Sequence, residues 1–421
     1  MDRAFDFSIQ KPSQSFSQSM GNSFRQTIAG IFSDKRMNKG VMLSSHLSST
    51  IARAKATEGE YLVASQDTTF YNYTGHKSMD GLGKLQGGIL GILQHNVLLT
   101  SELGIPIGVI HQQYWSRESA VDFDGKESLK WKNGLEAVNN SLSEIGKRVV
   151  LVQDREADIF SFFQSARAKN IDLLVRVFQP RNFEITSSGK VSKLVDLKQD
   201  LEEIGKKEVV ISRNGKEITL TLSLQACKVQ VLSSPNPHSS KPKTQELSLV
   251  IAQEIGAKDN KGNNVFDQEK AALWYLLTSL PIDNQADIER IVNFYSLRWR
   301  IERFHFTMKS GALNVEKLQF DDIETTINAL TFYSIVAWQL LAITYIFRED
   351  AESSAQTVFD EKEIGLLEKI GKKPINTVKD AVLALGKIVG FAKSKSQPLP
   401  GVKLLAQAFE RFYYIKLGND F

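Results

Sequence analysis

The sequence is poor in the residues that build disulfide scaffolds and zinc sites. It has one cysteine, Cys227, and six histidines among 421 residues. A single cysteine cannot form an internal disulfide or a thiolate zinc cluster, and the histidines include no His-x3-His pair. These shortages argue against a cross-linked secreted scaffold and against a zinc enzyme.

The sequence also lacks a strong excess of charge of either sign. The formal net charge is +4. A field this weak does not by itself attract DNA, so any nucleic-acid binding must come from local basic patches. Hydrophobic residues make up 42% of the chain, which is enough to bury a large core, and the length suggests two or three structural units.

Long apolar runs are nearly absent. Ala329–Phe347 is the longest, and it contains Thr331, Ser334 and Thr344, so we expect a buried core helix and no membrane segment. Met1–Ser19 is polar and predicts no signal peptide.

Four polar residues recur at helical spacing in a region rich in helix formers. Tyr295, Arg298, Glu302 and Lys309 stand three, four and seven residues apart. At about 100° of rotation per residue they fall within an arc of about 60° of one continuous helix. The apolar residues of the opposite face are Leu297, Ile301, Phe304 and Met308. This arrangement suits a surface that holds a metal and a phosphate chain, but an ordinary amphipathic helix with a solvated charged face has the same pattern.

Two carboxylates follow short apolar runs that are typical of buried strands. Tyr61–Gln66 leads into Asp67, and Arg148–Gln153 leads into Asp154. The carboxyl ends of strands are where α/β sheets place their sites. Asp154 alone could equally be a helix N-cap. Together with Glu302 the two aspartates form an Asp/Asp/Glu set.

The motifs together resemble a known family. Tyr295-x2-Arg298-x3-Glu302-x6-Lys309, with Asp67-Thr68-Thr69 and Asp154-Arg155-Glu156-Ala157-Asp158, is similar to the DDE transposases of bacterial insertion sequences that carry the YREK motif. This is the cut-and-paste group with a ribonuclease-H-like core. Three separated motifs occur in the family's order and with similar spacing, and the resemblance runs from about Ser15 to about Leu417.

The resemblance implies a DNA transposase that cleaves transposon ends and transfers strands to target DNA. Asp67, Asp154 and Glu302 would be the catalytic, metal-binding residues. Two Mg²⁺ ions, for which Mn²⁺ could substitute, are suited to such hard carboxylate oxygens and to phosphodiester cleavage. The partners implied are double-stranded DNA, both inverted-repeat ends and target, and a second copy of the chain in a homodimeric DNA complex. A bacterial, cytoplasmic location follows from the same resemblance.

Basic and hydroxyl side chains around this set are candidates for phosphate contacts. Arg298 and Lys309 can bind phosphates, and Tyr295 offers a hydroxyl to the same backbone. Arg298 could instead pair with Glu302 one turn later, and Lys309 could simply favour the end of the helix. Arg176 matches a basic position of the family, although an exposed strand arginine is an equally ordinary interpretation.

Trp274 matches a family tryptophan that stacks on a base flipped out near the cleaved end. Aromatic stacking can offset the cost of unstacking a base. A tryptophan that begins a strand is, however, usually a core residue. His305 also matches the family, whereas Phe306 stands where a lysine is often found, which removes one phosphate contact.

We therefore expect an α/β protein with a ribonuclease-H-like catalytic core and a β-rich insertion, flanked by helical regions. The predicted segments are a partial DNA-binding region at 1–60, the catalytic domain at 61–322 with its insertion at about 179–281, and a dimerisation region at 323–421. Within them we predict helices near 23–33, 41–56, 129–145 and 157–168, and strands at 88–100, 105–114, 171–178, 209–212, 217–224, 247–255 and 273–278. Asn214-Gly215 is a strong hairpin signal.

The amino terminus departs from the family, whose members usually carry a longer basic segment for recognising transposon ends. This supports an alternative function, a truncated and non-catalytic regulator that dimerises with full-length transposase and inhibits it. A general metal-dependent nuclease is a third possibility, because it would need the carboxylates but not the Tyr/Arg/Lys set. Specific binding to inverted-repeat DNA favours the transposase, and cleavage of arbitrary DNA favours the nuclease.

Overall fold

The computed structural model describes residues 29–76, 79–116, 127–213, 216–233, 243–311, 313–392 and 400–419. The predicted helix near 23–33 therefore lies partly outside the described residues, as do the Asn214-Gly215 turn and most of the Pro/Ser-rich stretch that follows Leu232. The chain forms two compact units, each built from segments that are distant in sequence. The first unit combines Met1–Thr57, Thr68–Gly125 and Arg300–Phe421, and the second combines Glu58–Asp67 and Lys126–Trp299.

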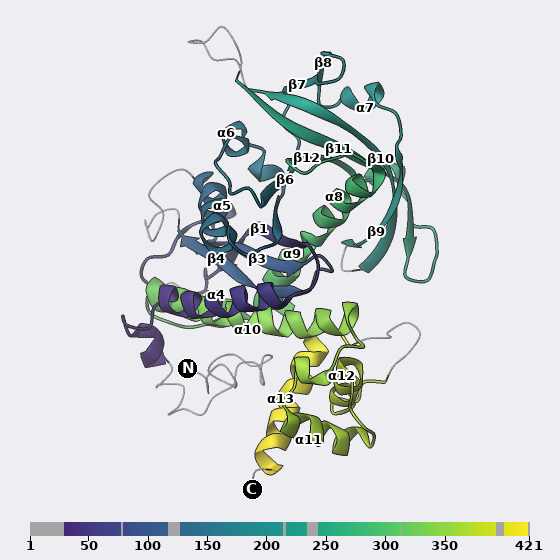
Figure 1. Ribbon diagram of the computed structural model, residues 1–421. Helices are drawn as coiled ribbons and strands as arrows, with labels where there is room; N and C mark the ends of the chain where they lie inside the picture. Colours follow the sequence, from purple (N-terminus) through teal and green to yellow (C-terminus); the bar gives the residue numbers. More distant parts are fainter. Residues whose placement is uncertain are drawn as a thin grey trace. The chain divides into compact units, whose positions relative to one another are not determined.

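Helices predominate in the first unit, which also contains strands of 12 and 10 residues (Figure 1). Its elements are α4 (Lys39–Ala56), β2 (Gly83–Lys84), β3 (Leu90–Ser101), β4 (Pro106–Trp115), α10 (Ile323–Glu349), α11 (Glu361–Gly371), α12 (Val378–Lys387) and α13 (Val402–Asn419), with 3-10 turns at Gln86–Gly88, Val315–Lys317 and Ala355–Thr357 and a π-helical turn at Thr307–Gly311.

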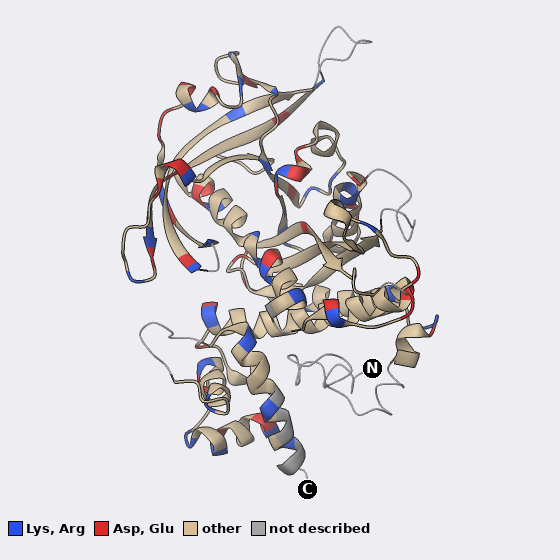
Figure 2. Cartoon of the chain, turned by 180° about the vertical axis from the view of Figure 1, so that it is seen from behind, with Lys and Arg blue, Asp and Glu red and all other residues tan. Residues whose placement is uncertain are grey.

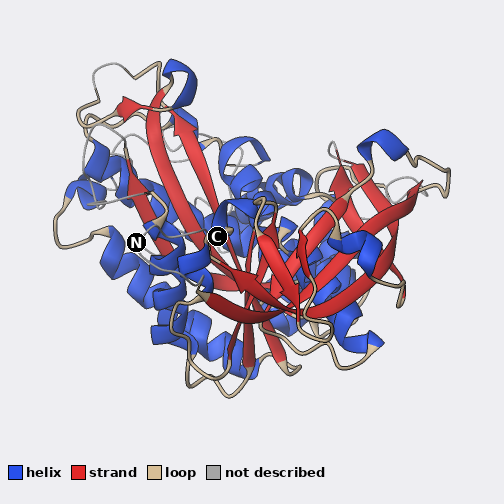
Figure 3. Ribbon diagram, turned by 90° about the horizontal axis from the view of Figure 1, so that it is seen from above, coloured by secondary structure: helices blue, strands red, loops and turns tan. Residues whose placement is uncertain are grey.

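Strands dominate the second unit. Its elements are α5 (Leu129–Leu142), β5 (Arg148–Gln153), α6 (Phe160–Phe163), β6 (Ile171–Val177), β7 (Asn182–Ile185), β8 (Val191–Lys193), α7 (Leu197–Asp200), β9 (Gly205–Arg213), β10 (Lys216–Leu232), β11 (Thr244–Asp259), β12 (Leu273–Thr278) and α8 (Gln285–Leu297), with 3-10 turns at Arg155–Ala157 and Gln268–Lys270. Two elements cross the boundary between the units: β1 (Tyr61–Asn72) and α9 (Trp299–Phe306). Figure 3 shows the strands and helices of the whole chain in different colours.

The core of the first unit is built around α10. This helix is apolar on all sides, and it packs against α4, β4, α12 and α13. It is long and apolar enough to cross a membrane, but 78% of its most apolar window is buried inside the protein, as expected for a core helix. Buried hydroxyl groups of this helix are hydrogen-bonded: Ser334 donates to the Leu330 carbonyl of the preceding turn, and Thr331 hydrogen-bonds the hydroxyl of the distant Tyr114 at 3.0 Å.

The second unit is a mixed sheet whose parallel part comes first in the chain. β1 pairs in parallel with β5, and β5 pairs in parallel with β6. β5 is buried along nearly its whole length, which explains why its sequence is a continuous run of valine and leucine and not an alternating pattern. The helix α5 precedes β5, as predicted, although it ends at Leu142.

The strands that follow β6 in the chain extend this sheet. β12 pairs antiparallel with β6, and β11, β10 and β7 follow in order, with β9 also paired to β10. The hairpin prediction is confirmed for its strands, because Arg213 of β9 pairs with Lys216 of β10. Alternate residues of these long strands, such as Leu220, Leu222 and Leu224, enter the core, and β12 has the predicted bounds.

Two secondary-structure predictions are wrong. The strand that contains Asp67 does not end there but continues to Asn72. The helix predicted over 157–168 is reduced to the single turn of α6. Side chains explain the second difference: Asp154 accepts a hydrogen bond from the Glu156 N–H, and Asp158 accepts from the distant Phe178 and Gln179 N–H groups, so both aspartates favour turns over a continuous helix.

Candidate active site

Asp67 and Asp154 lie at equivalent positions on two neighbouring parallel strands of the second unit. Ser65 of β1 pairs with Val152 of β5, and each aspartate follows two residues later. Because side chains alternate along a strand, both carboxylates continue the same face of the sheet, and hydrogen-bonded strands lie about 4.8 Å apart. Both side chains are partly exposed. The register of the two strands therefore places these two residues at neighbouring positions of the sheet.

Asp154 also has the structural role that the sequence left open. Its carboxylate caps the 3-10 turn Arg155–Ala157 by accepting from the Glu156 N–H at 2.8 Å. That bond uses one carboxylate oxygen. It fixes the side chain at the strand end and leaves acceptor capacity for another group.

Tyr295 is the centre of a buried cluster on the same side of the sheet. Its ring packs edge-on against Trp274, with 5.0 Å between the ring centroids, and the Arg298 guanidinium lies 5.9 Å from it. The Arg176 side chain also lies close to its hydroxyl. Burial raises the pKa of Tyr295 above its usual value, Arg298 and Arg176 oppose this, and Asp154 is close enough to add to the rise. The cluster and Asp154 thus share one electrostatic environment.

The motif residues do not lie on one continuous helix, which corrects the sequence analysis. α8 ends at Leu297, Arg298 occupies a turn, and α9 begins at Trp299. Arg298 keeps helical backbone angles, with φ −53° and ψ −32°, and Lys309 lies beyond α9 in the π-helical turn. Tyr295 and Arg298 are only 3% and 6% exposed, so this part of the motif is not a solvated charged face either.

The burial of Trp274 affects its predicted role in base stacking. Its side chain is 4% exposed and belongs to the core of the second unit. Stacking on a base would require the ring to be uncovered first. Arg176, by contrast, is partly exposed, and it also donates to the Leu273 carbonyl at 3.4 Å.

Glu302 and Lys309 belong to the first unit. Glu302 lies in the first turn of α9 and is partly exposed. Lys309 lies in the π-helical turn, with its ammonium 3.7 Å from the Glu316 carboxylate and 4.2 Å from the centre of the Phe70 ring. Glu316 in turn accepts from the Asn72 N–H at 2.8 Å.

Sequence reasoning missed a buried polar network in the first unit. Asn96 hydrogen-bonds His305 at 3.0 Å and accepts from Gln112, while the Thr68 hydroxyl contacts His95 at 2.9 Å. The sequence contains a sign of this network, because three polar residues, Gln94 to Asn96, interrupt an otherwise apolar strand. The structure shows that all three are fully buried. Such polar residues in a core are retained only when they are hydrogen-bonded.

Asp158 is a second residue whose importance the sequence did not reveal. Its buried carboxylate accepts from the N–H groups of Phe178 and Gln179 at 2.9 and 2.8 Å, and it pairs with Arg181. It therefore fastens the chain just beyond β6, the strand that carries Arg176, to the loop that begins at Asp154.

The carboxylates on these two neighbouring strands suit a hard divalent cation. Within the described residues, no group of three or more His, Cys, Asp or Glu side chains is gathered as a metal site. The Asp67 and Asp154 carboxylates nevertheless offer oxygen ligands at adjacent, partly exposed positions, and Mg²⁺ is usually bound by one or two carboxylates with further ligands from substrate and water.

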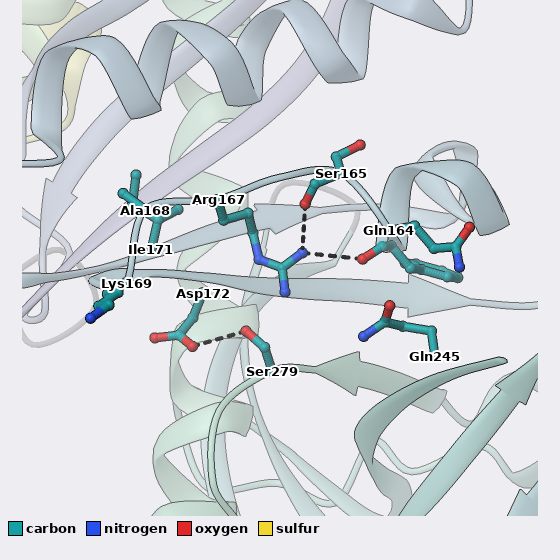
Figure 4. Close-up of a pocket in the computed structure, with 10 residues that line it drawn as sticks. Gln164, Ser165, Arg167, Ala168, Lys169, Ile171, Asp172, Gln245 and Ser279 are labelled. Atoms are coloured by element: carbon teal, nitrogen blue, oxygen red, sulfur yellow. Dashed lines mark hydrogen bonds between the residues drawn. The ribbon is translucent and has the colours of Figure 1, made fainter.

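A separate polar hollow of about 390 Å³ lies at the other end of the strands (Figure 4). Its lining includes Arg167, whose guanidinium donates to the Phe163 and Ser165 carbonyls, and Asp172, which accepts from Ser279 at 2.8 Å. Asp172 is near the amino end of β6, whereas Arg176 is near its carboxyl end. The hollow is therefore distinct from the candidate active site.

Part of the chain matches a known protein family. Residues 132–338 match the sequence model of the family described as the transposase DDE domain. This stretch of the chain is similar to DDE transposases. It includes Asp154, Glu302 and the whole Tyr295–Lys309 motif, while Asp67 precedes it.

A solved structure also aligns with the chain, the cryo-EM structure of a piggyBac transposase synaptic complex with hairpin DNA. The identity is 10% and the TM-score is 0.36, and the alignment covers 91% of this chain. The chain spans 66% of the length of that transposase. At this TM-score the likeness carries no weight for fold or function.

Proposed function

We propose that the protein is a DNA transposase that cleaves transposon ends and joins them to target DNA. The observation that carries the proposal is the placement of Asp67 and Asp154 at equivalent positions along the neighbouring parallel strands β1 and β5, in a chain whose residues 132–338 match the transposase DDE domain. We also propose that the catalytic core of this transposase is ribonuclease-H-like, which the strand order β4, β3, β1, β5, β6 supports.

In this proposal Asp67, Asp154 and Glu302 hold Mg²⁺ or Mn²⁺. When bound, the metal lowers the pKa of an attacking water or hydroxyl and stabilises charge on the phosphate oxygens. The chain's own residues bind and orient the DNA. Arg298 and Lys309 contact phosphates, Arg as a planar fork and Lys as a point charge.

Tyr295 and Arg176 have a positioning role in the proposal. The packing of Tyr295 on Trp274 and the bond from Arg176 to the Leu273 carbonyl hold both polar groups on the side of the sheet where Asp154 lies. Held side chains lose less entropy when substrate binds, which favours affinity and orientation. We further propose a homodimeric DNA complex that uses the carboxyl-terminal helices, and a bacterial cytoplasmic location.

Cleavage of the element that encodes the chain tests the function directly. The substrate is an end-labelled fragment that carries the gene with its flanking sequences, incubated with protein and Mg²⁺ and resolved on a denaturing gel. We expect Asp67→Asn, Asp154→Asn and Glu302→Gln each to reduce cleavage by about 1,000-fold or more, since each removes several kcal/mol of charge stabilisation.

Asp267→Asn is the matched control. Asp267 is an exposed aspartate that caps the turn at Gln268–Lys270, and asparagine preserves that cap. It should cleave at the rate of the native protein. Full cleavage by any of the three site variants, or cleavage that persists in EDTA, would contradict the proposal. Mn²⁺ should replace Mg²⁺, whereas Ca²⁺ should not support cleavage.

A further inference from the structure

Two exposed phenylalanines of the first unit are each paired with a basic side chain. Phe70 is 42% exposed and Phe306 is 43% exposed. The Lys309 ammonium lies 4.2 Å from the centre of the Phe70 ring, and the Arg303 guanidinium lies 4.7 Å from that of Phe306. We call these four side chains the cation–aromatic surface. A single exposed phenylalanine is ordinary, but two of them with cations beside them form a specific chemical pattern.

The local structure explains why these side chains are neighbours. Arg303 and Phe306 are three residues apart in α9, so they are adjacent on the helix surface. Lys309 follows three residues later in the π-helical turn. Phe70 comes from β1, and its contact with Lys309 joins the strand to that turn.

The surface carries a net positive charge. Among the described residues the Arg303 guanidinium has no ion-pair partner, and its ring contact with Phe306 leaves its N–H groups available. Lys309 faces Glu316 at 3.7 Å, but both side chains are partly exposed, so this pair is weak and a phosphate can compete with it. Figure 2 shows that basic and acidic residues are otherwise interspersed along the chain.

We propose that the cation–aromatic surface binds unpaired nucleotides of DNA. A base stacks on Phe306 or Phe70, while Arg303 and Lys309 contact the flanking phosphates. Every base offers an aromatic face, and the combination of stacking rings with cations is the chemistry by which proteins bind single strands. In a duplex the base faces are covered by their neighbours, so the rings can act only on unpaired nucleotides. This inference rests on the proposed DNA-processing function, and it gives Phe306 a role other than phosphate binding.

The salt dependence of binding distinguishes the contribution of the aromatic rings to the affinity from that of the basic side chains. The probes are a fluorescein-labelled 12-nucleotide oligo(dT) strand and a 12-base-pair duplex, followed by anisotropy at several salt concentrations. Phe70→Leu and Phe306→Leu should weaken single-strand binding by about 5- to 100-fold and leave both duplex affinity and the salt slope unchanged. Phe306→Trp should restore single-strand binding.

The charge variants should behave differently. Arg303→Gln and Lys309→Gln should weaken the binding of both probes and lower the salt slope by about 0.7 per phosphate contact for the single strand. Phe306→Lys should raise the slope while it removes the preference for unpaired bases. Leu103→Ala is the control, because Leu103 is an exposed apolar side chain of the same unit without an aromatic face.

Leucine variants that bind the single strand like the native protein, or that lose single-strand and duplex binding equally, would overturn the inference and leave the proposed function intact. A native protein that binds neither probe would overturn the proposed function as well. The two failures are therefore distinguishable.

Discussion

The buried pair of Asp158 and Arg181 makes a quantitative prediction about the second unit. The Asp158 side chain is completely buried, and that of Arg181 is 13% exposed. Burial lowers the pKa of Arg181, and Asp158 opposes that effect. Asp158→Asn keeps the size of the side chain but removes the charge, and it turns one of the acceptor oxygens that face N–H donors into an N–H₂ group.

The expected cost is about 3 kcal/mol of unfolding free energy. Removing one partner of a buried ion pair costs about 3–5 kcal/mol, mostly because the other charge is left buried without compensation. We take the lower end because Arg181 retains some solvent contact and also donates to the Asp158 backbone carbonyl at 2.9 Å. Arg181→Gln added to Asp158→Asn should recover part of the loss, since it removes the stranded charge.

Urea unfolding followed by circular dichroism measures these differences. Asp267→Asn is again the control, because its ion pair with Lys270 is exposed and contributes less than about 1 kcal/mol. An Asp158→Asn variant as stable as the Asp267→Asn control would refute the reasoning. So would a double variant with the summed cost of both single changes.

Two further predictions concern stability. Burial lowers the pKa of His46 to about 3 from the ordinary 6.5, and its neutral ring accepts a hydrogen bond from the Val109 N–H at 2.9 Å. Between these two pH values the unfolded chain therefore takes up a proton that the folded chain does not. The contribution of His46 to stability is full above about pH 6.5 and falls by up to about 1.4 kcal/mol per pH unit toward pH 3. His46→Gln should flatten this part of the pH dependence of the melting temperature, and an unchanged profile would contradict the assignment. Gly134→Ala should cost about 1–3 kcal/mol in urea unfolding, because its Cβ would lie 2.3 Å from the Gln66 side-chain oxygen. Gly365→Ala is the control, because the added Cβ would meet no atom within 4 Å inside α11, and it should raise the free energy of unfolding by about 0.5–1 kcal/mol. Equal effects of the two changes would show that packing at Gly134 is not tight.

The sequence alone determined most of the strands. Continuous apolar runs such as Arg148–Gln153 predict strands that are buried on both faces, and Asp154 follows this run directly after the end of β5. Periodicity and turn residues also predicted β9, β10 and the core helix α10. These features depend on local pattern, which a sequence displays directly.

Tertiary structure decided the features that depend on partners distant in sequence. Helical spacing predicted one continuous face for Tyr295 and Lys309, but the chain turns at Arg298. Burial of Tyr295 depends on Trp274 and Arg176, which reach it only through the pairing of β12 with β6. Such contacts follow from the folding of the sheet and leave no periodic signal in the sequence.

The turn after Asp154 has the same explanation. Residues 157–168 have helical periodicity, yet the Asp158 carboxylate binds N–H groups twenty residues further along the chain. A hydrogen bond to a distant backbone replaces the local bonds that would extend a helix. Local propensity is a weak preference of less than about 1 kcal/mol per residue, so a buried, charged hydrogen bond overrides it.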